Sequence, residues 1–109
     1  MTPAGMLRIA KELISTPETW TKGQLARDVN GNAVSSLLPT AVCYCGQGAI
    51  KAVACNFYLA QRPAQQFLHQ SRPNDYFARF SDFNDYPKTT HADVMAAFDR
   101  AIALAEASA

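Results

Sequence analysis

Three residues of the chain are of the types that form a thiol-based catalytic unit. Cys45 stands at the expected start of a helix, where the helix dipole favours the thiolate. His91 and Asp85 could act as the general base and its orienting carboxylate, with Asn84 as an alternative to Asp85. The competing interpretation makes Cys45 a small core residue and leaves His91 neutral in the first turn of the last helix. We expect the structural role, and a cysteine hydrolase is the third hypothesis for function.

A second set of residues could be counted as metal ligands: Cys43, Cys45, Cys55 and His69. Structural zinc sites usually separate their paired cysteines by two to four residues, whereas a single residue separates Cys43 from Cys45. We therefore expect no metal site and no cofactor.

The segment Gly46-Gln47-Gly48 could receive a phosphate on the free N–H groups of a helix start. It lacks the GxxxxGK[ST] pattern of a P-loop, and close packing of the helix is the alternative reason for two glycines. A nucleotide-like ligand bound here would find rings for its base and arginines for its phosphate nearby, namely Tyr44, Phe83, Tyr86, Arg27 and Arg79.

The segment 76–86 is dense in aromatic residues. We expect it to be irregular and to wrap over the core, with part of its rings buried. Exposed tyrosine and arginine side chains are typical anchors of protein interfaces, so the remaining part predicts an interaction patch formed by Tyr76, Arg79 and Tyr86. The sequence leaves open how the segment divides between core and interface.

Helices must position these residues. Thr2-Pro3 predicts the start of a first helix that ends near Ser15. A second helix is expected from the segment 44–50 to about Asn56, and a third over 57–70, where Pro63 could begin a shorter helix. The last helix opens at Thr90 with Asp93 three residues on, close to a capping box. Its predicted buried stripe is Val94, Met95, Phe98, Ala101, Ile102 and Ala105.

Between the first two helices, Asn30-Gly31 predicts the tip of a β-hairpin, with Trp20 at its entrance as a lid on the core. A lone hairpin is marginal in water, so it must pack on the helices. The expected fold is a single α+β domain over residues 1–109, mostly helical, with three to four helices and one hairpin packed on them.

Composition narrows the classes of function. The chain has 109 residues and a formal charge of +1, without a cluster of basic residues, which makes nucleic acid an unlikely partner. No stretch approaches 18 consecutive apolar residues, which predicts no membrane span. Arg8, Lys11 and Glu12 interrupt the first apolar stretch and argue against a signal peptide. Three cysteines without an export signal are expected to stay reduced, so we expect a cytoplasmic protein.

Four groups of residues carry a resemblance to a known family. They are Trp20 with the segment 23–28 and Gly31, the segment 44–50, the segment 83–85, and the segments 90–94 and 98–102. In this order and spacing the chain resembles small uncharacterised proteins of bacteria and their phages, a domain of unknown function. Members usually carry Trp where this chain has Tyr44 and Phe83. The resemblance brings no established activity, and it implies an accessory protein of phage or prophage type.

These observations predict binding and not catalysis. The first hypothesis is a phage-type accessory protein that inhibits a host defence or regulatory factor by protein–protein contact. The second is capture of a small nucleotide-like ligand. The identity of the target and the oligomeric state, a homo-oligomer included, are left open by the sequence.

Overall fold

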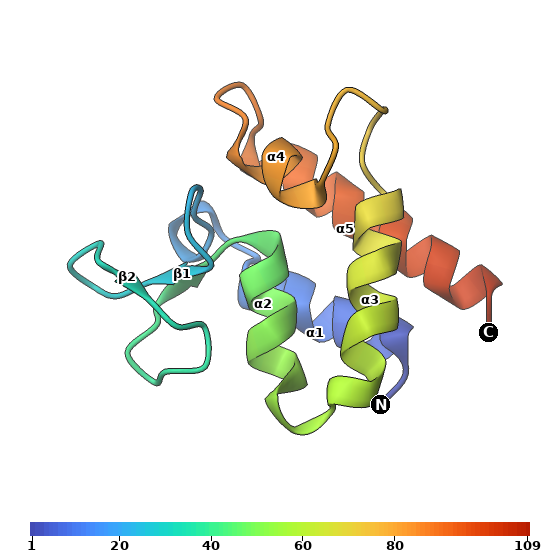
Figure 1. The fold of residues 1–109 in the computed structure, drawn as a ribbon, viewed down its shortest axis with the longest axis horizontal. Coiled ribbons are helices and arrows are strands. Elements are labelled where there is room, and N and C mark those ends of the chain that lie inside the picture. Colours follow the sequence, from blue (N-terminus) through green and yellow to red (C-terminus); the bar gives the residue numbers. More distant parts are fainter.

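Four helices form the main layer of the fold in the computed structural model, which describes the backbone of residues 1–109 and all side chains except those of Asn56 and Tyr58 (Figure 1). They are α1 (Pro3–Leu13), α2 (Gly46–Val53), α3 (Tyr58–Gln70) and α5 (His91–Ala107). Helix α1 packs against the other three, and α3 also packs against α5. None of the helices in the described part of the chain is long and apolar enough to cross a membrane.

The first and last helices begin where the sequence predicted. The Thr2 hydroxyl accepts a hydrogen bond from the Gly5 N–H at 3.0 Å, with Pro3 in the first helical position. At α5, the Thr90 hydroxyl accepts from the Asp93 N–H at 3.1 Å, while the Asp93 carboxylate accepts from the Thr90 N–H at 2.9 Å. Each cap satisfies N–H groups that have no partner inside the helix, which makes these two starts local properties of the sequence.

The core lies between the four helices. Its largest fully buried apolar side chains are Phe80, Phe98, Met6, Leu7, Ile14, Ile50, Leu68 and Val94. The predicted stripe of α5 is confirmed at four positions that are buried, while Met95 and Ile102 are half-buried against the core.

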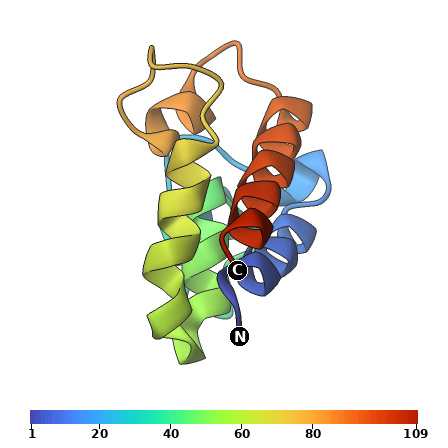
Figure 2. The same ribbon diagram turned by 90° about the vertical axis from the view of Figure 1, so that its right-hand side faces the viewer.

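Two ion pairs join α1 to α5. Arg8 contacts Glu106 and Lys11 contacts Asp99, each at 2.6 Å between nitrogen and oxygen. Helices α1 and α5 lie side by side, with the two termini at the same end of the molecule (Figure 2).

The predicted hairpin is confirmed and belongs to a small antiparallel sheet. Strands β1 (Ala26–Arg27) and β2 (Ala33–Val34) pair around a turn in which Gly31 has a φ of +81°. A third strand, β3 (Cys43–Tyr44), pairs with β1 on its other side, so the order is β2-β1-β3. This sheet leads directly into α2. The fold is therefore α+β and mostly helical, as predicted.

Three local predictions differ from the structure. The segment 76–86 contains a short helix, α4 (Phe80–Asp85), so there are five α-helices in the described chain in place of three to four. Pro63 lies inside α3 and does not start a shorter helix. The second helix ends at Val53 and is followed by a single 3₁₀ turn over Ala54–Asn56.

Candidate functional site

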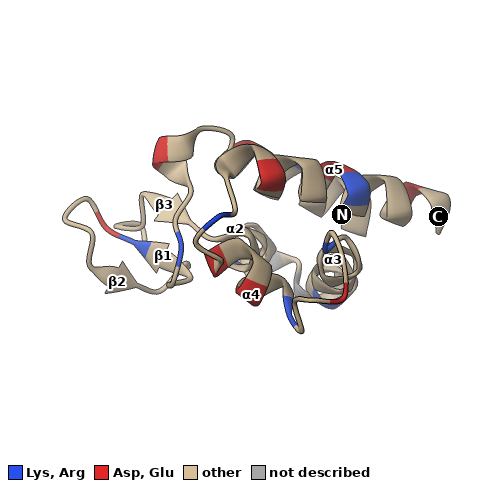
Figure 3. Ribbon diagram, turned by 90° about the horizontal axis from the view of Figure 1, so that it is seen from above, with Lys and Arg blue, Asp and Glu red and all other residues tan. Residues whose placement is uncertain are grey.

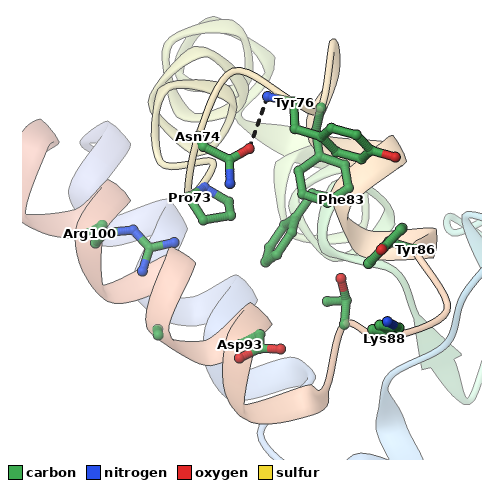
Figure 4. A pocket seen from close by; sticks show the side chains of 11 residues that line it. Pro73, Asn74, Tyr76, Phe83, Tyr86, Lys88, Asp93 and Arg100 are labelled. Carbon is green, nitrogen blue, oxygen red and sulfur yellow. Dashed lines mark hydrogen bonds between the residues drawn. The ribbon is translucent and has the colours of Figure 1, made fainter.

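A pocket of about 530 Å³ opens between the segment 73–77, the end of α4 and the outer face of α5 (Figure 4). Its lining residues are Pro73, Asn74, Tyr76, Phe77, Phe83, Tyr86, Lys88, Thr89, Asp93, Ala96 and Arg100. The volume falls in the range of ligand pockets, and the lining combines four aromatic rings with five polar or charged side chains.

One wall of the pocket is a cluster of four rings. Phe77 lies at its centre, with ring centroids 5.0 Å from Tyr76, 5.4 Å from Phe83 and 5.3 Å from Tyr86, all packed edge to face. Phe77 and Phe83 are buried, Tyr86 is half-buried, and 77% of Tyr76 is exposed. The aromatic segment thus divides as the two sequence hypotheses allowed: its phenylalanines build the core, and its tyrosines form the rim.

The opposite wall carries charge. Asp93 and Arg100 lie on α5 with Ala96 between them, and Lys88 lies on the turn that leads into this helix (Figure 4). The Arg100 guanidinium is held by hydrogen bonds from Nε and Nη2 to the Ser71 carbonyl, at 3.0 Å and 2.8 Å. The pocket therefore combines an apolar wall with a fixed cation.

Asn84 fixes α4, the helix that supplies Phe83 to the ring wall and ends just before Tyr86. It is fully buried, and its side-chain oxygen accepts hydrogen bonds from Trp20 Nε1 at 2.9 Å and from the Gly46 N–H at 3.1 Å. Its amide nitrogen donates to the Thr21 carbonyl at 3.1 Å and to Asp85 at 2.9 Å. All four bonding positions of the amide are thus used, which ties α4 to α2 and to the segment before β1.

The hydrogen bonds around Asn84 continue through Asp85 and Lys22 to the turn that follows α4, at the mouth of the pocket. Asp85 accepts a hydrogen bond from the Gly23 N–H at 2.8 Å, and Gly23 has a φ of +82° that suits glycine. Lys22 donates to the carbonyls of Tyr86 at 2.7 Å and Pro87 at 3.3 Å. Several residues that carry the family resemblance therefore meet here and hold the pocket wall in place.

The glycines at the start of α2 are explained by close packing. A Cβ at Gly46 would lie 2.5 Å from the Phe80 ring, and one at Gly48 would lie 1.9 Å from the Leu25 carbonyl oxygen. Their N–H groups are also bonded, that of Gly46 to Asn84 and that of Gly48 to the Cys45 sulfur at 3.3 Å. This geometry favours the packing interpretation over a phosphate site at this helix start.

The three side chains of the thiol hypothesis do not form a hydrogen-bonded unit. The Cys45 side chain is buried at the start of α2, and burial raises the pKa of its thiol, with the Gly48 N–H partly opposing this effect. His91 bonds through Nε2 to the Ile14 carbonyl at 2.7 Å. Asp85 bonds to Gly23 and Asn84. A thiol of raised pKa is a poor nucleophile at neutral pH, so the arrangement favours a structural role for Cys45.

The remaining predicted site residues are spread over the fold. Tyr76 and Tyr86 meet at the pocket, with ring centroids 6.1 Å apart. Arg79 is exposed at the start of α4 and pairs with Asp82 at 3.0 Å, away from the pocket lining. Tyr44 lies in β3, and the Arg27 guanidinium bonds to Thr21, Lys22 and Gly31 within the hairpin region.

Sequence reasoning missed Lys88, Asp93 and Arg100 as pocket residues. One pattern could have found two of them, because Asp93, Ala96 and Arg100 are spaced by three and four residues and so share one face of α5. Lys88 and the rings reach this face only through the tertiary fold, and no local pattern indicates that.

Basic and acidic residues are interspersed along the part of the chain seen in Figure 3. Among the described residues, no group of three or more His, Cys, Asp or Glu side chains could hold a metal ion.

Comparison with known proteins gives a family and no activity. No curated protein and no solved structure matches the chain. A family model described as "Family of unknown function (DUF6197)" matches residues 1–104, and the chain therefore belongs to this family.

Proposed function

We propose that the protein is a binding protein that docks on a partner protein through the aromatic pocket. The observation that carries the proposal is the pocket itself, about 530 Å³ between a rigid ring wall and the charged face of α5. Interfaces commonly concentrate their binding energy in a pocket of this kind, where one partner inserts an anchoring side chain.

The rim supports a protein partner. Tyr76 is largely exposed, yet its backbone N–H bonds to Asn74 at 2.9 Å and its ring packs on Phe77. A tyrosine held in this way offers a large amphipathic contact surface and loses little conformational entropy on binding. Tyr76 and Tyr86 are therefore the anchors we propose, in agreement with the sequence hypothesis, whereas Arg79 is not among the residues lining the pocket.

The finer proposal is that the partner is a host defence or regulatory factor and that the protein inhibits it. This part rests on the resemblance to accessory proteins of bacteria and phages alone. The pocket lining among the described residues includes no cysteine and no histidine, so we propose binding without a thiol reaction at this site.

A small ligand with a ring and an anionic group is the second candidate. Lys88 and Arg100 are the observation that favours it, because both line the same pocket as four rings that could stack on a base or another planar group. This candidate moves the nucleotide-like ligand of the sequence hypothesis from Gly46 and Gly48 to the pocket.

Native mass spectrometry of the protein purified from its natural host cells tests both candidates. We compare the wild-type protein with Ala96→Trp, which places an indole in the pocket from an exposed position of α5. Ala92→Trp is the matched control, since it adds the same side chain one turn earlier on the same helix, outside the pocket lining.

A partner protein bound to the wild type and to Ala92→Trp, but lost from Ala96→Trp, supports the proposal. A bound mass of a few hundred daltons with the same dependence supports the second candidate in its place. A complex that survives in Ala96→Trp shows that the pocket is not the docking site, and the proposal then fails.

A further inference from the structure

The aromatic pocket and a second hollow are neighbours along α5, and we call the two together the groove. The second hollow has a volume of about 380 Å³, and its lining residues are Gln70, Ser71, Arg72, Arg100, Ala103, Leu104 and Ala107. The two hollows share Arg100. The α5 positions 93, 96, 100, 103 and 107 are spaced by three or four residues, so they form one continuous face of the helix. Arg100 therefore stands between the aromatic pocket and a second, mostly apolar hollow.

The charges along this groove are mainly positive. Arg100 bonds to the Ser71 carbonyl, and Arg72 bonds to the carbonyls of His69 and Phe77. Neither arginine, nor Lys88 at the pocket mouth, pairs with a carboxylate among the described residues. The linings of the two hollows thus contain three cations and one carboxylate, that of Asp93. Its Oδ2 already accepts a hydrogen bond from the Thr90 N–H.

The guanidinium of Arg100 is held in one orientation before any anion binds. Nε and Nη2 are fixed on one carbonyl, which leaves Nη1 without a hydrogen bond among the described residues. A cation that is oriented before binding loses less entropy when it meets a carboxylate, and hydrogen bonds between two charged groups are the strong ones.

We infer that the groove binds an acidic peptide segment of the partner protein, with an apolar side chain in each hollow and a carboxylate on Arg100. This inference rests on the proposed function, because it names the chemistry of the segment that enters the same pocket. Ala96 and Ala103, which lie in the two hollows, are seven residues apart on α5, or about 10 Å. An extended peptide presents only every second side chain to the same face, so its positions i, i+2 and i+4 face one surface and span about 13 Å. The expected segment therefore has apolar residues at positions i and i+4, with an Asp or Glu at position i+2 on the same face.

Selection from a random dodecapeptide display library tests the inference. The library is panned on the wild-type protein and on Ala96→Trp, and peptides that bind only the wild type are sequenced. The selected peptide is then synthesised with its central Asp or Glu and with the matching Asn or Gln. Both peptides are titrated against the wild-type protein, Arg100→Gln and Arg62→Gln. Arg62 is an exposed arginine of α3 outside both hollows and serves as the control for loss of one positive charge.

We expect the amide peptide to bind the wild type and Arg62→Gln about tenfold more weakly than the acid peptide. The two peptides should bind Arg100→Gln with affinities within about twofold of each other, because this variant lacks the guanidinium that the peptide carboxylate contacts. If Arg100→Gln does not fold, Arg100→Lys replaces it and should keep most of the preference for the acid.

Pocket-dependent peptides without a central acid, or with equal affinity for acid and amide on the wild type, overturn the inference and leave the proposed function standing. An acid preference that persists on Arg100→Gln also overturns it. Failure to select any peptide that depends on Ala96 counts against the proposed function as well.

Discussion

For Gly48→Ala, helix propensity and packing predict opposite changes in the free energy of unfolding. Gly48 occupies the third position of α2, and its N–H bonds to the side chain of the helix cap, Cys45. Helix propensity alone predicts that alanine stabilises this position by up to about 1 kcal/mol. The packing of α2 against the residue before β1 predicts the reverse, because the new Cβ would lie 1.9 Å from the Leu25 carbonyl oxygen.

This close contact sets the size of the expected loss in stability. Cβ atoms in folded proteins essentially never lie closer than 3.0 Å to another heavy atom, so α2 and the backbone at Leu25 must separate by more than about 1 Å. The obstacle is backbone and cannot rotate away. Overpacking of this kind costs about 1–3 kcal/mol, and separation also weakens the bond from the Cys45 N–H to the same carbonyl, about 1 kcal/mol more. After the gain in helix propensity, we expect a net loss of about 2 kcal/mol, which lowers the melting temperature by about 10 °C.

Gly5→Ala is the matched control. Gly5 is the third residue of α1, its N–H bonds to the Thr2 cap, and its added Cβ would meet only the Thr2 hydroxyl at 3.2 Å and a flexible methionine at 3.8 Å. We expect this variant to melt at or slightly above the temperature of the wild type. Both variants are followed by thermal and urea unfolding. Equal or higher stability of Gly48→Ala relative to the wild type would refute the packing argument.

Two further outcomes follow from the buried groups around this helix. Asn84→Asp keeps both acceptor bonds but loses the donor bonds to Thr21 and Asp85. We expect the free energy of unfolding to fall by about 2–3 kcal/mol at pH 8, and by less toward pH 4, because protonation removes the repulsion between adjacent carboxylates. An equal loss at both pH values would contradict this. Because burial raises the pKa of the Cys45 thiol, iodoacetamide at pH 7.5 should modify exposed Cys55 first and Cys45 last, as measured by peptide mass spectrometry. Rapid, selective modification of Cys45 would favour the thiol hypothesis instead.

The elements that sequence reasoning predicted correctly have local causes. Thr2-Pro3 and the pair Thr90 and Asp93 bond within their own first turns, so the starts of α1 and α5 do not depend on the rest of the fold. Asn30-Gly31 likewise supplies the positive φ of the hairpin turn from its own residues. In each case the sequence contains both partners of the interaction within a few positions.

Helix α4 and Pro63 show where local patterns are insufficient. Helix α4 has six residues and follows Arg79, which is not a preferred cap, and it is held by ring contacts such as that of Phe80 with Phe98 at 6.4 Å. Pro63 removes one hydrogen bond in α3, to the carbonyl of exposed Leu59, which the packing of this helix tolerates.

The site was predictable only in part for the same reason. Sequence reasoning placed Tyr76 and Tyr86 together, because they share one segment. It considered Asn84 only as a catalytic alternative, whereas the side chain bonds to Trp20, 64 positions away, and to Gly46, 38 positions away. Partners at such separations are brought together by packing, which no local spacing encodes.

The pairing of α1 with α5 has a consequence for biosynthesis. The ribosome releases α1 before α5, yet the ion pairs Arg8–Glu106 and Lys11–Asp99 need residues made 98 and 88 positions later. Until α5 has been synthesised, one side of α1 and α3 remains uncovered, and the floor of the groove does not exist. The nascent chain therefore exposes the apolar sides of α1 and α3 until α5 emerges, and the groove forms only then.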